Sequence, residues 1–173
     1  MPHMKDPFFG RSVVYISKHN TNGAMGFIIN KPFGETDEEF MKSLYIDEDN
    51  LLSIVPTVYF GGPVSVERGV ILHTSDYTSR ETIKISEDFS ITSSKNTLRD
   101  IHSREGPKEF RLMLGYAGWL GGQLEREIKN GDWLMQSTNI EFIFRTPDEL
   151  KWEYAAESLG IKTFEISGLG GVA

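Results

Sequence analysis

The sequence predicts a single-domain α+β protein with a mostly antiparallel sheet. Short runs of β-branched and aromatic residues recur along the chain and are separated by turn residues, which is typical of strands. Two other stretches carry apolar residues at helical spacing. Of the 173 residues, 39% are apolar and 25% are charged, which suits one globular core. No repeat, low-complexity stretch or linker divides the chain, so we expect residues 1–173 to form one domain.

The first part of the chain predicts a β-hairpin, a short helix and further strands. Residues 12–19 and 24–30 are rich in β-branched and apolar residues, and the NTNG segment between them tolerates the φ angles of a tight turn. Pro32 ends the second strand because it lacks an N–H. A capping box predicts a helix over 37–45. The strands that follow are predicted at 58–60, 69–74, 82–86 and 89–92.

The second part predicts helices around one central strand. Ser93 or Ser94 caps a short helix, and residues 110–116 (FRLMLGY) form the strand. The elements predicted after it are an amphipathic helix with Leu120, Leu124 and Ile128 on one face, extended structure over 132–136, a buried trio at 142–144, and a helix that starts at Thr146 and stops at Gly160. We expect the glycine-rich tail over 167–173 to be frayed.

Composition limits the classes of function. The net charge of −7 repels phosphate backbones and anionic lipids, which makes direct nucleic-acid binding an unfavoured hypothesis. No cysteine is present, so disulfides, zinc–thiolate sites and cysteine nucleophiles are excluded. No apolar stretch is long enough to span a bilayer, and the start of the chain does not have the pattern of a secretory signal. We therefore expect a cytoplasmic protein without a membrane partner.

Familiar motifs for cofactor binding and catalysis are missing. The sequence contains no Gly-Lys-Ser/Thr tripeptide, no Gly-x-Ser-x-Gly, and no Gly-x-Gly-x-x-Gly between a strand and a helix. Its four histidines stand apart, without the spacing that brings two imidazoles to one metal. The sequence therefore predicts no metal, no cofactor and no assigned catalytic residue.

Three turn-like segments are candidates for a binding site. Residues 61–63 (GGP) and 30–32 (NKP) each follow a predicted strand, and residues 115–119 (GYAGW) run from a predicted strand into a helix. If these segments meet, Tyr116 and Trp119 would wall a cleft with a helix N-terminus at its side. The alternative, which we favour, is that each glycine only supplies a tight turn or close packing.

Blocks spread over nearly the whole chain resemble the YqgE/AlgH family: DPFF at 6–9, NKP at 30–32, GGP at 61–63 and GYAGW-x-x-GQLE at 115–125. The resemblance implies an α+β fold whose bifurcated, mainly antiparallel sheet curls into a pseudo-barrel with flanking helices. Members are often labelled transcriptional regulators because of a link to alginate production, and the resemblance implies no known enzyme activity. It carries over no catalytic role to any position of this chain.

One departure from the family pattern concerns the start of the chain. Relatives usually have an apolar strand ahead of the segment that matches residues 1–4. Without that strand, a sheet edge next to residues 12–19 would be exposed, and self-association could follow.

These observations leave three hypotheses. The leading one is a non-enzymatic binding or regulatory protein that acts through a partner or small ligand. The alternatives are a regulator that binds DNA directly and a small-molecule enzyme that uses His73 or Glu125. Ligand identity and oligomeric state cannot be derived from the residues. The candidate binding residues are Asn30, Lys31, Pro32, Gly61, Gly62, Pro63, His73, Tyr116, Gly118, Trp119, Gln123 and Glu125.

Overall fold

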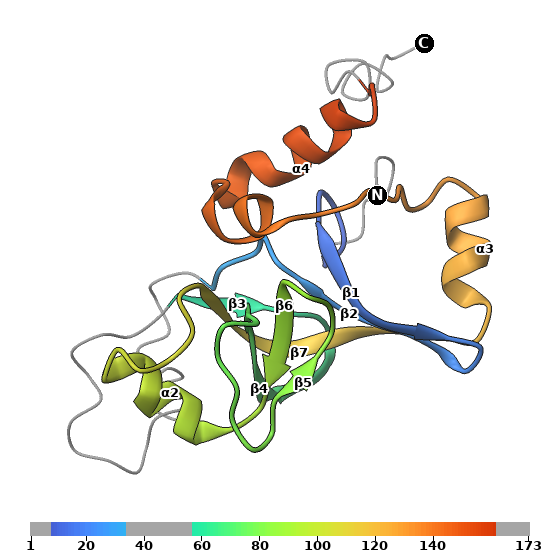
Figure 1. Ribbon diagram of the computed structural model, residues 1–173. Helices are drawn as coiled ribbons and strands as arrows, with labels where there is room; N and C mark the ends of the chain where they lie inside the picture. The colour runs from blue at the N-terminus through green and yellow to red at the C-terminus, as the bar shows by residue number, and fades with distance from the viewer. Residues whose placement is uncertain (1–7, 34–56, 162–173) are drawn as a thin grey trace.

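A curled, seven-stranded sheet organises the residues that the computed structural model describes, which are 8–33 and 57–161 (Figure 1). Its strands are β1 (Val14–Asn20), β2 (Gly23–Ile28), β3 (Val58–Phe60), β4 (Val64–Thr74), β5 (Ile83–Lys84), β6 (Phe89–Thr92) and β7 (Phe110–Leu120). They lie in the order β1-β2-β7-β4-β6-β5, with β3 also beside β7. Every strand pairing is antiparallel except that of β3 with β7. The predicted α+β fold with a mainly antiparallel sheet is confirmed.

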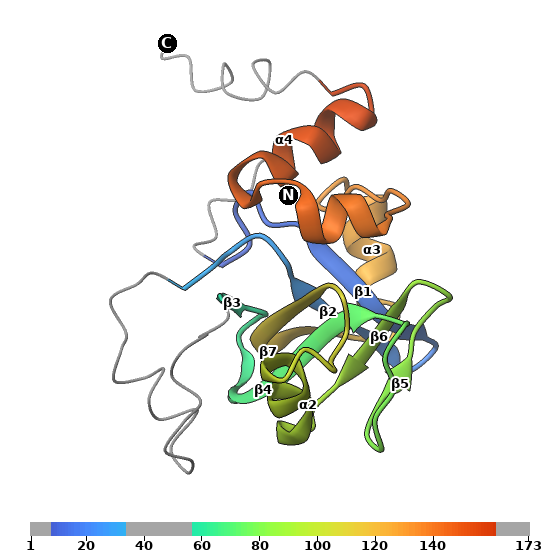
Figure 2. The same cartoon turned by 60° about the vertical axis from the view of Figure 1, so that its left-hand side comes forward.

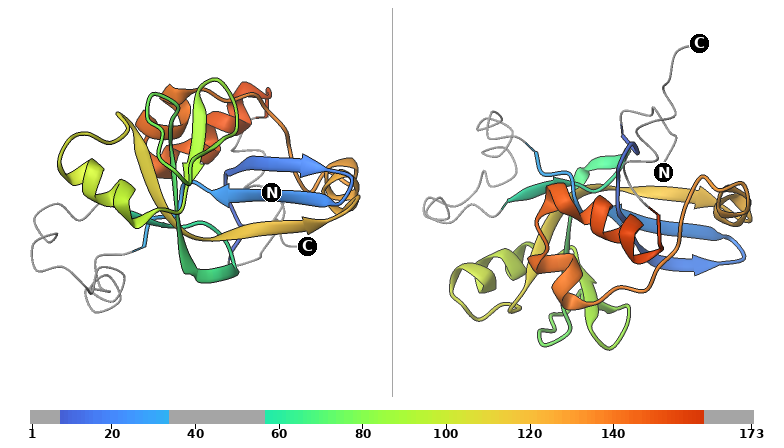
Figure 3. Two further views of the ribbon diagram at one scale, coloured as in Figure 1. Left: turned by 60° about the horizontal axis from the view of Figure 1, so that its bottom comes forward. Right: turned by 90° about the horizontal axis from the view of Figure 1, so that it is seen from above.

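Strand β7 joins two arms of the sheet. Its residues 110–114 pair with β4, whereas residues 117–120 pair with β2. Gly115 lies between these two halves and has a φ of 70°. The two sets of strands diverge at this point, so that the sheet forks into a β1–β2 arm and a β4–β6–β5 arm (Figure 3).

Helices cover parts of both arms. They are α2 (Lys95–His102), α3 (Gln123–Lys129), a π-helical turn η2 (Glu141–Arg145) and α4 (Asp148–Ser158). Helix α3 lies beside the β1–β2 arm, and α2 and α4 lie at opposite ends of the described part of the molecule (Figures 1 and 2). The chain after β7 therefore returns from α3, through η2, to place α4 near the start of β1.

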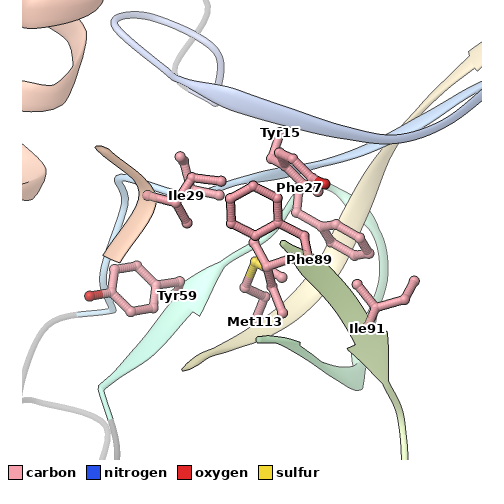
Figure 4. Close-up of a cluster of buried hydrophobic side chains, with 9 residues drawn as sticks. Tyr15, Phe27, Ile29, Tyr59, Phe89, Ile91 and Met113 are labelled. Carbon is pink, nitrogen blue, oxygen red and sulfur yellow. The ribbon is translucent and has the colours of Figure 1, made fainter. Parts of the chain in front are cut away.

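The main apolar core lies where the two arms curl toward each other. Tyr15 and Phe27 from the first arm meet Phe89 and Ile91 from the second, with Met113 of β7 beneath them (Figure 4). The rings of Tyr15 and Phe89 lie 5.2 Å apart. Burial of these side chains is the main favourable contribution to folding.

The structure confirms the predicted positions of the strands and of three helices, and it corrects several boundaries. Strand β7 continues to Leu120 instead of ending near Tyr116, and residues 132–136 form no strand. Of the predicted buried trio, Ile143 is fully buried and its two neighbours are partly buried. Pro147 rather than Thr146 occupies the N-cap of α4. The predicted helix over 37–45 and the tail over 167–173 lie outside the described residues.

Glycines permit an unusually close approach of two backbone segments at the fork. A Cβ atom on Gly62 would lie within 3.0 Å of the backbone of Tyr116, and one on Gly115 would lie within 3.0 Å of Gly62 O. Real Cβ atoms essentially never come so near a backbone atom. The GGP turn therefore lies directly on β7. Of the two alternatives for these glycines, a ligand cleft or close packing, the structure shows close packing.

We predict that Gly62→Ala lowers the free energy of unfolding by about 3 kcal/mol, because the new methyl group clashes with fixed backbone at a φ of 152°. Gly69→Ala is the matched control, since its Cβ would meet Leu112 Cδ1 at an ordinary 3.7 Å. That variant should change stability by less than about 1 kcal/mol. Urea unfolding followed by tryptophan fluorescence measures both, and equal losses would contradict the packing role of Gly62.

Candidate functional site

The three predicted turn segments do meet, and backbone hydrogen bonds join them. Phe60 N–H donates to Lys31 O, and Gly61 N–H donates to Leu114 O, each at 2.8 Å. Pro32 forms an isolated bridge with Tyr59. The space between these segments is filled by backbone, as the close approach at the fork shows.

Tyr116 and Trp119 cannot wall one cleft, which corrects the predicted geometry. Because β7 continues as a strand past Gly115, residues an odd number of positions apart point to opposite faces. Tyr116 packs against the main core, whereas Trp119 packs against Trp133 and Leu124. Gly118, which was predicted to belong to a turn, pairs with Met25 inside the sheet, and Pro63 is exposed at the surface.

Asn30 and Lys31 fasten the segment that precedes β1. Asn30 Oδ1 accepts from Val13 N–H at 2.8 Å, and its Nδ2 donates to Arg11 O at 3.0 Å. Lys31 Nζ donates to Phe8 O at 2.7 Å. Both side chains thus position residues 8–13 against the end of β2.

His73 and Glu125 lie near opposite ends of β7 and share no site. His73 is fully buried opposite Phe110, and its Nδ1–H donates to Thr74 O at 2.8 Å. Glu125 pairs at 2.8 Å with His19, near the other end of β7, and half of its side chain is exposed. The length of β7 separates the two regions by about 30 Å at roughly 3.3 Å per residue. His73 and Glu125 therefore cannot act together as one acid–base pair, and the enzyme hypothesis is left with either residue alone.

Burial lowers the pKa of His73, because the charged imidazolium would lose its hydration inside the sheet. Its Nε2 has no hydrogen-bond partner among the described residues. The ring of Tyr77 lies edge-on to it, with centroids 5.7 Å apart. His73 is therefore a neutral core residue.

A carboxylate that sequence reasoning missed orders the region around Trp119. Glu127 Oε2 accepts from the indole N–H of Trp119 at 2.7 Å and from that of Trp133 at 2.9 Å. Gln123 Nε2 donates to the other carboxylate oxygen at 2.9 Å, and Gln123 Oε1 accepts from Leu120 N–H. A signal was present in the sequence, because Glu127 lies three residues after Leu124 on the inner side of an amphipathic helix.

An apolar groove opens beside these indoles and has a volume of about 300 Å³. We call it the tryptophan groove, because all three tryptophans of the chain line it. Its lining consists of residues 12–16, Ile29, Trp119, Leu124, residues 133–136, Thr138, Phe142, Ile143, Trp152, Ala155, Ala156 and Leu159. None of these is Asp, Glu, His, Lys or Arg, so the groove itself presents no strong acid or base.

A smaller, charged hollow of about 220 Å³ shares Trp152 with the tryptophan groove. Its other lining residues are Gly10, Arg11, Asn30, Lys31, Asp148, Glu149 and Glu153. The guanidinium of Arg11 lies 5.3 Å from the centroid of the Trp152 ring. The predicted residues Asn30 and Lys31 therefore lie beside the groove, and Trp119 lies within it.

A buried charge cluster holds α4 over the sheet and so fixes one wall of the groove. Asp148 Oδ1 lies 2.9 Å from Arg111 Nη1 and 3.0 Å from Lys151 Nζ. The Arg111 contact is an ion pair without hydrogen-bond alignment, whereas Arg111 Nε donates to Ile143 O at 2.8 Å. Lys151 also donates to Thr146 O.

The cluster perturbs its own members. Burial, and after it the charge of Arg111, lowers the pKa of Lys151. The ring of Tyr59 lies 4.3 Å from the Arg111 guanidinium, and burial raises the pKa of Tyr59 to about 12. The sequence signal for this cluster is Arg111, a charged residue inside an otherwise apolar strand.

A family model described as AlgH-like matches residues 1–164 of the chain. The chain belongs to the AlgH-like family. UPF0301 proteins of Shewanella loihica and Proteus mirabilis are 40% and 42% identical to it. Both matches cover all of this chain, and they cover 94% of the first relative and 95% of the second. The names of these AlgH-like relatives state no activity, ligand or partner.

Two solved structures support the AlgH-like assignment at the level of the fold. The solution structure of the AlgH protein from Pseudomonas aeruginosa matches with a TM-score of 0.78 at 35% identity, over all of this chain and 92% of that one. A crystal structure of a Corynebacterium diphtheriae protein matches with a TM-score of 0.72 at 19% identity, over 96% of this chain and 86% of that one, which shows the fold alone.

Within residues 8–33 and 57–161, no helix has both the length and the apolar character needed to cross a membrane. Nor do three His, Cys, Asp or Glu side chains of these ranges come together in a way that could hold a metal ion.

We predict that Glu127→Ala lowers the free energy of unfolding by about 2–4 kcal/mol, since two indole N–H groups and Gln123 lose a charged acceptor. Tryptophan emission should change in the folded variant. Glu125→Ala, on the same helix, is the control and should leave the unfolding midpoint nearly unchanged, because Glu125 is at the surface. Denaturant unfolding compares them, and equal midpoints for the two variants would contradict this role of Glu127.

A second prediction concerns pH. A neutral buried histidine binds its proton more weakly in the folded state than in the unfolded state, so stability is lost as the pH falls below the ordinary value of 6.5. The loss attributable to His73 should approach about 1.4 kcal/mol per pH unit.

The variant His73→Asn keeps a donor for Thr74 O but cannot titrate, so the difference between the two unfolding free energies should shrink as the pH is lowered from 7. Urea unfolding at several pH values measures this difference. A difference that does not vary with pH would show that His73 is not held neutral by the fold.

Proposed function

We propose that this AlgH-like protein is a cytosolic, non-enzymatic binding protein with a regulatory role, and that the tryptophan groove holds its ligand or partner. The observation that carries the proposal is that Trp119, Trp133 and Trp152 all line one apolar hollow. Its volume of about 300 Å³ falls at the lower end of the range of ligand sites, and such sites are lined mainly by apolar and aromatic side chains.

The groove is pre-organised, which supports a binding role. Glu127 holds the indoles of Trp119 and Trp133 in an edge-to-face arrangement with centroids 5.9 Å apart. The cluster around Asp148 holds α4 in place on the other side. A site whose walls are fixed before binding loses little conformational entropy when the ligand enters.

The two other hypotheses have less support. An enzyme that used His73 or Glu125 would need one of them at the groove, and neither lines it. Direct DNA binding would have to overcome a net charge of −7. The regulator label of the family therefore fits action through a bound partner or ligand better than action on a phosphate backbone.

Intrinsic fluorescence tests the proposal, because every tryptophan of the chain lies at the groove. We expect the apolar dye 1-anilinonaphthalene-8-sulfonate to quench tryptophan emission and to gain emission by energy transfer. Ala155→Phe should weaken dye binding by about tenfold or more, since a phenyl group fills much of the hollow.

Glu157→Phe is the matched control, because it adds the same ring to α4 at an exposed position outside the groove. Its dye affinity should equal that of the wild type. If both variants bind the dye equally well, or if the wild type shows no quenching, the groove is not the binding site.

A further inference from the structure

Strand β1 lies at one edge of the sheet. Among the described strands it pairs with β2 alone, so its other side faces no strand. The tryptophan groove runs along that side, because five consecutive residues, 12–16, all belong to its lining. Of these, Val14, Tyr15 and Ile16 belong to β1, and consecutive residues of a strand point to opposite faces, so a hollow that all three line follows the backbone edge.

The register shows which backbone groups face the groove. Ile29 N–H donates to Val13 O at 2.9 Å, and Tyr15 lies opposite Phe27 in the same ladder. Hydrogen-bonded pairs alternate along antiparallel strands. Tyr15 therefore directs its N–H and C=O to β2, while Val14 and Ile16 direct theirs into the groove.

Both faces of this free edge are apolar. Trp119, Leu124 and Trp133 lie on one side, and Phe142 and Ile143 of η2 are among the residues on the other. An occupant that fits must place apolar groups on both faces and polar groups toward β1. An extended peptide does this, because its side chains alternate between faces while its backbone groups lie in the plane between them.

The charges beside the groove indicate which residue type should flank the apolar residues of such a peptide. The hollow beyond Trp152 holds Glu149 and Glu153, and neither forms an ion pair with another described residue. Arg11 lies on the Trp152 ring and Lys31 Nζ donates to Phe8 O. A basic residue at one end of the peptide would complement the two glutamates.

We propose that the free edge of β1 accepts, as an added strand, a short extended segment of another protein that is apolar on both faces and basic at one end. This rests on the tryptophan groove being the binding site. Two outward-facing residues limit the paired stretch to about four or five peptide residues at roughly 3.3 Å each. The register shift after Ile16 ends it on one side, and on the other Ser12 N–H already donates to Phe9 O at 3.1 Å.

The probe is a hexapeptide of two lysines followed by Val-Ile-Val-Thr, with both ends blocked. It should quench tryptophan emission and displace 1-anilinonaphthalene-8-sulfonate. Two N-methylated forms separate strand addition from plain apolar binding, because methyl groups on alternate residues remove the N–H groups of one edge at a time. One form should bind at least about tenfold more weakly than the parent, and the other should bind within about threefold of it.

Equal affinity of the two methylated forms would overturn strand addition. The Glu149→Gln/Glu153→Gln double variant gives a second check and should weaken the binding of the lysine peptide while leaving that of a version with two serines unchanged. The two proposals can fail separately. If Ala155→Phe abolishes dye binding but the two methylated peptides bind equally well, the proposed function stands and only strand addition is removed.

Amide hydrogen exchange gives the residue-level readout. In the free protein, the amides of Val14 and Ile16 should exchange fast and that of Tyr15 slowly, and the peptide should protect the first two. Protection of Val14 and Ile16 before any peptide is added would overturn the proposal. If that protection were lost when the chain is truncated after Ile161, the chain's own end would be the occupant. If it were lost on dilution, the occupant would be a second copy of the chain.

Discussion

The close approach of two backbone segments at the fork of the sheet is the constraint on which the rest of the structure depends. Gly62 and Gly115 bring the turn between β3 and β4 directly onto β7, and Gly115 turns β7 toward its second partner. Without this contact, one strand could not belong to both arms. The fork in turn places β1 at an edge and α3 beside Trp119, so the candidate site is a consequence of backbone geometry far from it.

The second wall of the groove depends on charge instead. Asp148 meets two cations, Arg111 and Lys151, in a place where all three are largely removed from water. Buried ion pairs contribute little net stability, because desolvation offsets much of the attraction, but breaking one leaves an uncompensated charge. The cluster therefore serves mainly to fix where α4 begins, and the main-chain oxygens of Ile143 and Thr146 extend that constraint to η2.

Local patterns predicted the strands and helices because their signals lie within a few residues of one another. The continuation of β7 was missed because GYAGW has the composition of a turn, and its extended form is stabilised by pairing with β2, more than 90 residues earlier in the chain. The strand ends met as predicted, but the surface that we propose for binding is the tryptophan groove. Its walls come from segments spread over much of the chain, and no spacing in the sequence indicates that Trp119, Trp133 and Trp152 line one hollow.

The free edge of β1 has a different kind of protection from most sheet edges. Edges are usually blocked by charged residues, proline or bulges, and residues 12–16 (SVVYI) contain no charge and no proline. The irregularity of β1 comes only after Ile16. Because α4 and η2 stand across the groove, another sheet cannot approach this edge, whereas a single extended chain can enter. The strand addition that we propose relies on this arrangement, because it limits edge-to-edge aggregation while still admitting one extended chain.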